Sequence, residues 1–337
     1  MHDEDSATPE RIWQLLTGFQ MTAAFKAAVE LEIFTLIAKG NVTAEQIAQA
    51  AGTELRGVRI LCDTLTVIGL LRKDGGQYSL ADDAAMFLVK TSPAYIGSVT
   101  DFMTSPQQMA GFTNLTEAVR KGGAVADTNY SLDPESPMWA NFARSMAPMM
   151  MPAAMTMAGS LGVDADAAIK VLDIAAGHGM FGIAVAMNFP NAEIYAADWK
   201  NVLAVAEENA AKYGVADRFH KIEGSAFDAD LGSGYDVILV TNFLHHFDPP
   251  TNETFLKRCR AALKDDGQLL TLEFVPNDDR VSPPAEALFS LVMLAATPAG
   301  DAYTFAELDT MLKNAGFANN EHRPMNGTPQ HWIASHI

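Results

Sequence analysis

The feature that most constrains how this chain can fold is the alternation of short apolar segments and helical segments after Lys170. Strands are expected over residues 171–175, 193–197, 218–222, 235–241, 268–275 and 331–335. Helices are expected over residues 179–188, 201–213, 253–263, 286–296 and 305–315. Because parallel strands need helical crossovers, the alternation predicts an α/β domain with a parallel sheet and helices on both faces. Ligands should bind beyond the carboxyl ends of its strands.

The first third of the chain is expected to form a separate, largely helical domain. Residues 9–18, 20–30 and 32–38 carry Ala, Leu and Phe at helical spacing. Thr43 and Gln46 form a capping-box pattern for a helix over residues 44–50, and a helix over 54–69 follows. Residues 70–73 and 77–80 flank an Asp-Gly-Gly turn, which predicts a hairpin. This order of elements predicts a winged-helix domain over residues 1–100.

The rest of the chain is expected to divide into a helical connector over residues 101–160 and the α/β domain over residues 161–337. A Gly-, Asp-, Ser- and Pro-rich stretch, residues 121–137, predicts a surface loop within the connector. The methionine-rich helix expected over residues 139–159 is interpreted mainly as adaptable core packing, with one or two side chains lining a substrate pocket.

A winged helix can bind DNA, but the charge of this chain argues against that role. The chain has 41 acidic and 23 basic side chains and a formal net charge of −18. Such a surface repels a phosphate backbone. We therefore interpret the first domain as a dimerisation module, because the apolar helices over residues 20–30 and 32–38 need a partner surface. The expected assembly is a two-fold homodimer without a nucleic acid partner.

The cysteine content and the apolar runs bear on location. The two cysteines, Cys62 and Cys259, exclude a disulfide framework and favour a reducing cytoplasm. The acidic N-terminal residues differ from a signal peptide. The longest apolar run, around residues 288–296, is shorter than the roughly 20 residues that cross a bilayer. We expect a cytoplasmic protein with no membrane partner.

The glycine-rich turn after the first strand of the α/β domain fits two kinds of adenosine cofactor. Gly177, Gly179 and Gly182 match the dinucleotide fingerprint G-x-G-x-x-G. Asp198, at the end of the next strand, can hold the hydroxyls of a ribose. Asp173, just before the turn, suits a cationic sulfonium and ammonium better than a pyrophosphate. At this point NAD and S-adenosylmethionine (SAM) both remain open.

Four motifs, in order, resemble those of class I SAM-dependent methyltransferases. Residues 171–179 resemble motif I, VLDxGGGxG, and Asp198-Trp199 resembles the acidic second motif. Residues 223–227 resemble the GDFF-like third motif, and residues 244–247 resemble the LHDW motif of the plant-type O-methyltransferase family (methyltransferase family 2). That family also carries an N-terminal winged-helix dimerisation domain. The resemblance implies a Rossmann-like methyltransferase sheet, SAM as cofactor and S-adenosylhomocysteine (SAH) as product.

The resemblance also implies which residues bind SAM. Gly177 and Gly179 should lie near the methionine part, Asp198 at the ribose and Trp199 against the adenine. The full implied cofactor set is Asp173, Gly177, Gly179, Asp198, Trp199, Ser225, Ala226, Thr241 and Phe247. The sequence departs from the family at several places: Ala175 and Ala176 replace glycines, Ser225 replaces an aspartate, and Thr241 replaces a common lysine. His178, within the turn, is expected to face solvent.

Transfer of a methyl group to a hydroxyl requires removal of the hydroxyl proton. Histidine suits this role because its ordinary pKa is about 6.5. In the resembling family the LHDW histidine is the general base, which corresponds to His245, and Glu273 matches its first supporting carboxylate. Ala302 stands at the family's second carboxylate, with Asp301 one residue away. No metal is expected, because the adjacent histidines His245 and His246 would chelate one ion poorly.

The substrate pocket is expected between the methionine-rich helix, the helix over residues 286–296 and the sheet edge. Pocket residues implied by the resemblance, with two further candidates, are Phe142, Met146, Met293, Phe289 and Trp139. The favoured function is O-methylation of a small molecule. The alternatives are S- or C-methylation, for example of a thioether that needs no base, a winged-helix ligand-sensing regulator, and an NAD-linked oxidoreductase.

Overall fold

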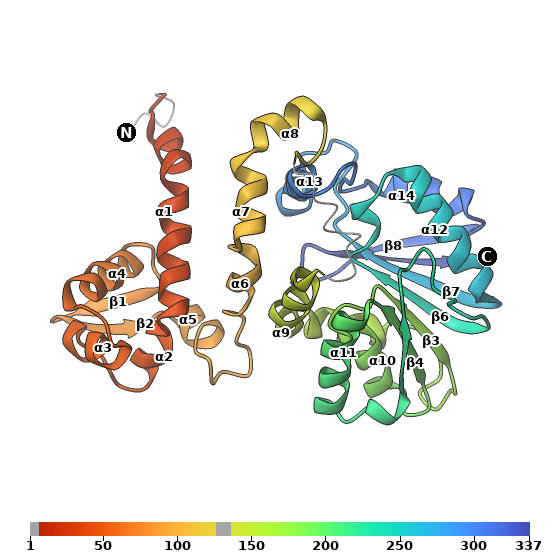
Figure 1. The fold of residues 1–337 in the computed structure, drawn as a ribbon, viewed down its shortest axis with the longest axis horizontal. Helices are drawn as coiled ribbons and strands as arrows, with labels where there is room; N and C mark the ends of the chain where they lie inside the picture. Colours follow the sequence, from red (N-terminus) through yellow and green to blue (C-terminus); the bar gives the residue numbers. More distant parts are fainter. Residues whose placement is uncertain (1–6, 126–135) are drawn as a thin grey trace, which may run out of the picture. The chain divides into compact units, whose positions relative to one another are not determined.

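The computed structural model describes residues 7–125 and 136–337, and the chain divides into two compact units, Met1–Thr104 and Ser105–Ile337 (Figure 1). None of the helices in the described residues is long and apolar enough to cross a membrane. Most of the stretch predicted as a surface loop, residues 126–135, lies outside the described residues.

The first unit consists of helices and one antiparallel hairpin. Its elements are α1 (Glu10–Glu30), α2 (Ile33–Ala38), α3 (Ala44–Ala51), α4 (Leu55–Val67), β1 (Leu71–Asp74), β2 (Gln77–Leu80), α5 (Asp82–Phe87) and α6 (Val99–Met103). The capping box is confirmed, since the Gln46 backbone N–H donates to Thr43 Oγ1 at 3.3 Å. The predicted break after Gly18 is wrong, because α1 runs through that glycine without interruption. A single glycine weakens a helix without ending it.

The core of the first unit lies under α2, α3, α4 and the hairpin. Phe34, Ile47, Leu65 and Tyr78 are almost fully buried there. The first half of α1 does not share in this core. Its exposed apolar side chains are Ile12, Trp13, Leu15, Leu16 and Phe19.

The second unit contains the α/β fold. Its helices are α7 (Pro106–Thr113), α8 (Leu115–Lys121), α9 (Pro137–Gly159), α10 (Met180–Asn188), α11 (Lys200–Lys212), α12 (Pro249–Ala262), α13 (Pro284–Ala296) and α14 (Phe305–Asn314). Its strands are β3 (Lys170–Ile174), β4 (Glu193–Asp198), β5 (Phe219–Glu223), β6 (Tyr235–Thr241), β7 (Leu263–Glu273), β8 (Asn319–Pro324) and β9 (His331–His336).

These strands form one sheet in the order β5-β4-β3-β6-β7-β9-β8. The strands β3 to β7 are parallel, whereas β9 pairs antiparallel with both β7 and β8. The α/β fold is confirmed, but β8 was not predicted. Its residues are mostly polar and exposed because it lies at the sheet edge, so it lacks the apolar alternation that marks a strand.

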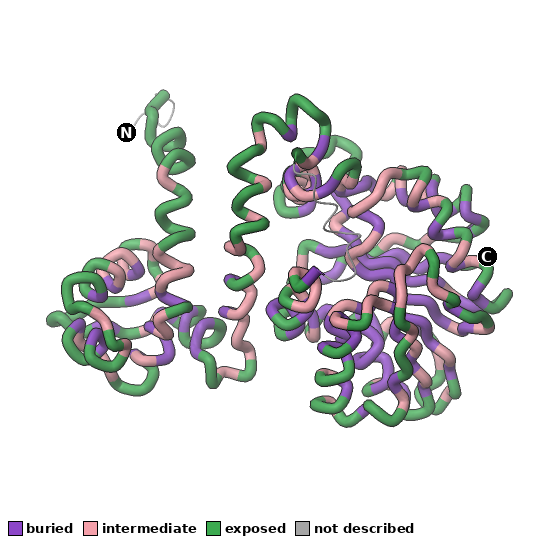
Figure 2. The backbone as a smooth tube through the Cα atoms, viewed as in Figure 1, coloured by how far each residue is buried: buried purple, intermediate pink, exposed green. Residues whose placement is uncertain are grey.

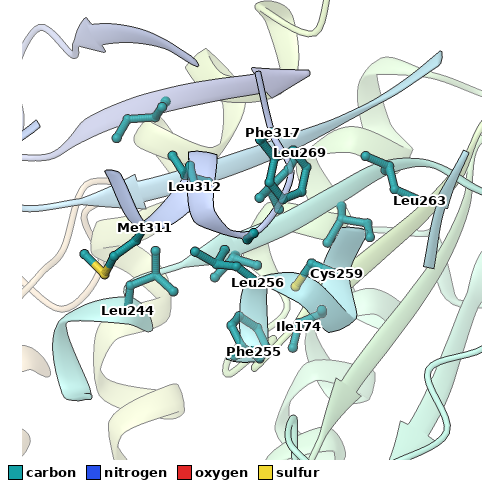
Figure 3. Close-up of a cluster of buried hydrophobic side chains, with 14 of the residues drawn as sticks. Ile174, Leu244, Phe255, Leu256, Cys259, Leu263, Leu269, Met311, Leu312 and Phe317 are labelled. Carbon is teal, nitrogen blue, oxygen red and sulfur yellow. The ribbon is translucent and has the colours of Figure 1, made fainter. Parts of the chain in front are cut away.

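The side chains of β3 alternate between the two faces of the sheet, and helices cover both faces. Leu172 and Ile174 belong to a core shared with α12 and α14 (Figure 3). Asp173 lies between them in sequence, so it points to the opposite face, where it contacts Gly182 of α10. Figure 2 shows that buried residues follow the strands between these two layers of helices. The carboxyl ends of β3, β4, β6 and β7 therefore meet at one edge.

Candidate active site

The loop after β3 bends through left-handed backbone conformations. Ala175, Gly177 and Gly179 have φ angles of 53°, 57° and 74°. The Gly177 N–H donates to Asp198 Oδ2 at 2.8 Å, and the Trp199 N–H donates to Asp198 Oδ1 at 2.7 Å. Burial nevertheless raises the pKa of Asp198 to about 6. The end of β4 thus holds the glycine loop through a carboxylate.

Asp173 lies beneath the same loop and is fully buried. Its Oδ2 accepts a hydrogen bond from the Gly182 N–H at 3.0 Å, whereas its Oδ1 has no hydrogen-bond partner. Burial raises the pKa of Asp173 to about 8. A Cβ on Gly182 would lie 2.6 Å from Ile194 Cγ2, so only glycine lets α10 approach the sheet here. This unpaired oxygen can accept a hydrogen bond from a ligand, and a cation bound there would favour the ionised form of Asp173.

The expectation that His178 faces solvent is wrong, because its side chain is buried. His178 Nδ1 accepts a hydrogen bond from the Met180 N–H at 3.1 Å, at the first turn of α10. The Asn209 amide of α11 donates to the His178 carbonyl at 2.9 Å. Burial lowers the pKa of His178 to about 4, so the ring is neutral. His178 thus accepts from a first-turn N–H of α10 and joins the loop to α11.

The other residues implied as cofactor ligands lie at the ends of neighbouring strands. Trp199 precedes α11 and packs on an apolar cluster shared by α9 and α11. Ser225 and Ala226 follow β5, where Ser225 Oγ accepts from the Phe227 N–H at 3.2 Å. Thr241 is buried at the end of β6. The Phe247 ring lies 5.0 Å from the ring of Phe227.

The 3₁₀ turn Leu244–His246 after β6 carries the expected base. His245 Nδ1 lies 2.5 Å from Oε2 of Glu273, the last residue of β7, and both side chains are buried. Glu273 Oε1 accepts from the backbone N–H groups of Phe243 and Leu244 at 2.9 and 2.8 Å. A carboxylate oxygen accepts from an imidazole N–H, so in this pair Nδ1 is the donor and Nε2 is the ring nitrogen that faces away from Glu273.

Aromatic rings surround His245. The Phe289 ring of α13 meets it edge-on at 4.9 Å, and Phe274 stacks on Phe289 at 3.8 Å. Sequence reasoning did not single out Phe274, although it directly follows Glu273. His246 lies beside His245, with ring centroids 4.4 Å apart, and meets the Trp139 ring edge-on. Burial lowers the pKa of His246 well below its ordinary value, so the ring is uncharged.

The place of the family's second carboxylate is apolar in this chain. Ala302 is fully buried, and Asp301 pairs with Arg280 at 3.2 Å. Among the described residues, Glu273 is the carboxylate that contacts the His245 ring. The loop before Ala302 packs closely on the backbone of His245, since a Cβ on Gly300 would lie 2.1 Å from the His245 carbonyl oxygen.

The expected substrate residues lie on two helices. Phe289 contacts the base directly, and Met293 is buried one turn further along α13. On α9, Met146 is buried, and Phe142 meets Trp139 edge-on at 5.8 Å. The structure thus brings Phe289 and Trp139 to the two histidines. In residues 7–125 and 136–337, no three metal-ligating side chains gather.

Comparison with known proteins agrees with this geometry. A family model described as the O-methyltransferase domain matches residues 112–318, and one described as the O-methyltransferase dimerisation domain matches residues 13–90. The 3-hydroxy-5-methyl-1-naphthoate 3-O-methyltransferase of Streptomyces sahachiroi is 30% identical over 311 residues, covering 91% of this chain and 89% of that protein.

Solved structures show the same fold. A crystal structure described as a candidate O-methyltransferase of Nostoc punctiforme PCC 73102 is 46% identical, with a TM-score of 0.94, and covers 99% of this chain and 100% of its own. Human N-acetylserotonin methyltransferase in complex with SAM is 21% identical, with a TM-score of 0.85, and covers 100% and 99% of the two chains.

Proposed function

Since the chain belongs to the SAM-dependent O-methyltransferase family with an N-terminal dimerisation domain, we propose that it methylates an aromatic hydroxyl with His245 as general base. The observation that carries the base assignment is the buried His245–Glu273 pair. Family membership favours oxygen as the acceptor over the sulfur and carbon alternatives that the sequence left open.

In this proposal the carboxylate of Glu273 orients the base. Three hydrogen bonds hold it: two from the backbone of the β6 loop and one from His245 Nδ1. The proton on Nδ1 fixes the tautomer, so His245 Nε2 accepts the proton of the acceptor hydroxyl. Positioning of the hydroxyl against the methyl group supplies much of the rate of such an in-line displacement.

SAM, when bound, supplies a methyl group on a positively charged sulfur. The proposed ligands of its nucleoside are Asp198 for the ribose and Trp199 for the adenine, with Phe247, Ser225, Ala226 and Thr241 around them. The loop glycines Gly177 and Gly179 let the backbone approach the methionine part closely. Asp173 lies below, where its partnerless oxygen supports binding of a cationic ligand.

The substrate class follows from the lining near the base. Phe289, Phe274 and Trp139 present ring faces and edges, which favours a flat apolar acceptor. Phe142, Met146 and Met293 are proposed to extend this surface. Relatives carry the names of a hydroxynaphthoate methyltransferase and of acetylserotonin methyltransferases, both of which describe aromatic acceptors.

We also propose that the protein is a homodimer formed through its first unit. The family model for dimerisation covers residues 13–90. Trp13, Leu16 and Phe19 on α1 are 60%, 59% and 66% exposed, and such an apolar surface marks an interface.

The test begins with SAH formation from SAM in the presence of N-acetylserotonin, 3-hydroxy-5-methyl-1-naphthoate and their methyl ethers. Activity on a free hydroxyl, with none on its methyl ether, would support the proposal. His245→Ala should lower kcat by about 10²–10⁴-fold on the fastest acceptor. Near-normal turnover by that variant would exclude the base assignment. Calorimetric titration with SAH should show normal binding to His245→Ala and weak binding to Asp198→Ala.

A further inference from the structure

A second buried pair of an acid and a histidine lies in the same unit, outside the proposed machinery. Glu286 is in the first turn of α13, and His331 is the first residue of β9. Glu286 Oε1 lies 3.5 Å from His331 Nε2, and the residues are 7% and 9% exposed. His331 Nδ1 lies 2.7 Å from Nε2 of His322 on β8. The pair therefore joins α13 to the antiparallel edge of the sheet.

The protons along this chain can be assigned from the chemistry of its members. A carboxylate only accepts hydrogen bonds, so His331 Nε2 carries a proton toward Glu286. Burial lowers the pKa of both His331 and His322, so both rings are neutral. His331 Nδ1 then accepts a hydrogen bond from His322 Nε2. Each ring thus has one tautomer, and the chain of contacts is directional.

This pair connects to the base from two sides. Across the β7–β9 ladder, His331 stands directly opposite Glu273, the residue that holds His245. Along α13, Glu286 lies one turn before Phe289, on the same helix face. The ring of Phe289 in turn contacts the ring of His245 at 4.9 Å. His245, Glu273, His331, Glu286 and Phe289 are therefore linked by side-chain contacts, by the pairing of β7 with β9 and by helix α13.

The polar character of the pair needs a reason. Removing a carboxylate and an imidazole from water carries a desolvation cost, and apolar side chains of similar volume would hold a helix to a sheet as firmly. A carboxylate facing an imidazole at 3.5 Å, however, favours one separation of the two elements, whereas apolar contacts permit sliding. Placement matters here because Phe289 packs against His245. Within the described part of the chain, Glu273 is the carboxylate at the His245 ring, and the buried Ala302 stands at the family's second acidic position.

We propose that Glu286 and His331 are positioning residues for the methyl transfer: their polar contact at 3.5 Å sets α13 so that Phe289 holds the His245 ring. The pair does not touch the reacting atoms and acts through Phe289. The inference rests on the proposed role of His245 as the base.

The experiment is a double-mutant cycle with the full-length protein and the fastest acceptor found in the panel above. Glu286→Leu and His331→Leu should each lower kcat by about 10–100-fold, the effect expected of a small misplacement of a catalytic group. The Kd for SAH should change less than about twofold. Glu286→Gln, which keeps an acceptor for His331 Nε2, should retain kcat within about threefold.

The cycle tests whether the effect passes through Phe289. In a Phe289→Ala background, Glu286→Leu should lower kcat by less than about threefold, because the contact it sets is already absent. The surface pair His220 and Glu193, 2.6 Å apart on β5 and β4, is the matched control. Glu193→Gln and His220→Leu should leave kcat unchanged.

Multiplicative losses in the double variant would overturn the proposal, as would unchanged kcat in both leucine variants. If the leucine variants do not fold, His331→Gln replaces them in the cycle. Its effect on kcat should then be smaller in the Phe289→Ala background than in the unaltered protein, and equal effects would overturn the proposal. Loss of activity in His245→Ala together with normal kcat in both Glu286→Leu and His331→Leu would refute only this inference. Normal turnover in His245→Ala would refute the base assignment and this inference with it.

Discussion

Replacement of Glu273 by glutamine would test how the buried carboxylate controls the base. The change keeps the shape of the side chain and alters only the atoms facing Phe243, Leu244 and His245. The amide oxygen can still accept from the two backbone N–H groups. The amide nitrogen then faces His245 Nδ1 and can only donate, so Nδ1 must become an acceptor. The single ring proton moves to Nε2, where the base needs a lone pair.

The magnitude follows from these contacts. Glu273→Gln removes the function of the base while its ring stays in place, so kcat should fall by about 10²–10⁴-fold. Hydrogen bonds to a charged acceptor contribute more than those to a neutral one, so the free energy of unfolding should fall by roughly 1–3 kcal/mol. A folded protein with slightly lower Tm and little activity is therefore expected.

The assay is the initial rate of acceptor methylation at saturating SAM and acceptor, with thermal melting of the same samples. Glu193→Gln, at the surface pair with His220, is the matched control and should behave as the unaltered protein. A kcat for Glu273→Gln within threefold of the unaltered protein would show that the carboxylate does not set the tautomer of His245.

Three further outcomes are expected. The SAH affinity should fall as the pH drops below about 6, because burial raises the pKa of Asp198 to about 6 and ribose hydroxyls donate to the ionised form. Calorimetry should find no such pH dependence in Asp198→Asn, and a flat profile in the unaltered protein would contradict the assignment of Asp198 to the ribose. Ala175→Gly should raise the free energy of unfolding by about 0.5–1 kcal/mol, because alanine has a φ of 53° there; an unchanged or lower Tm would refute the strain argument. Leu16→Asp on the exposed face of α1 should halve the mass measured by light scattering, and a dimeric variant would exclude this interface.

Much of the fold could be predicted from local patterns. The alternation after Lys170 predicted the α/β sheet, and the pairing of Thr43 with Gln46 predicted a helix start that the structure confirms. Such signals depend on neighbours within one or two turns, so a sequence displays them directly. The edge strand β8 escaped prediction because its polar residues pack on only one neighbour, β9.

The sequence by itself identified the family, the cofactor class and His245, after β6, as the expected base. Only the tertiary structure decided how side chains from distant elements meet: that two backbone N–H groups hold Glu273, that His178 is buried, and that Glu286 of α13 faces His331 of β9. The physical reason is that strand register and helix placement set these contacts. Both result from packing of the whole domain, whereas a motif records only residues adjacent along the chain.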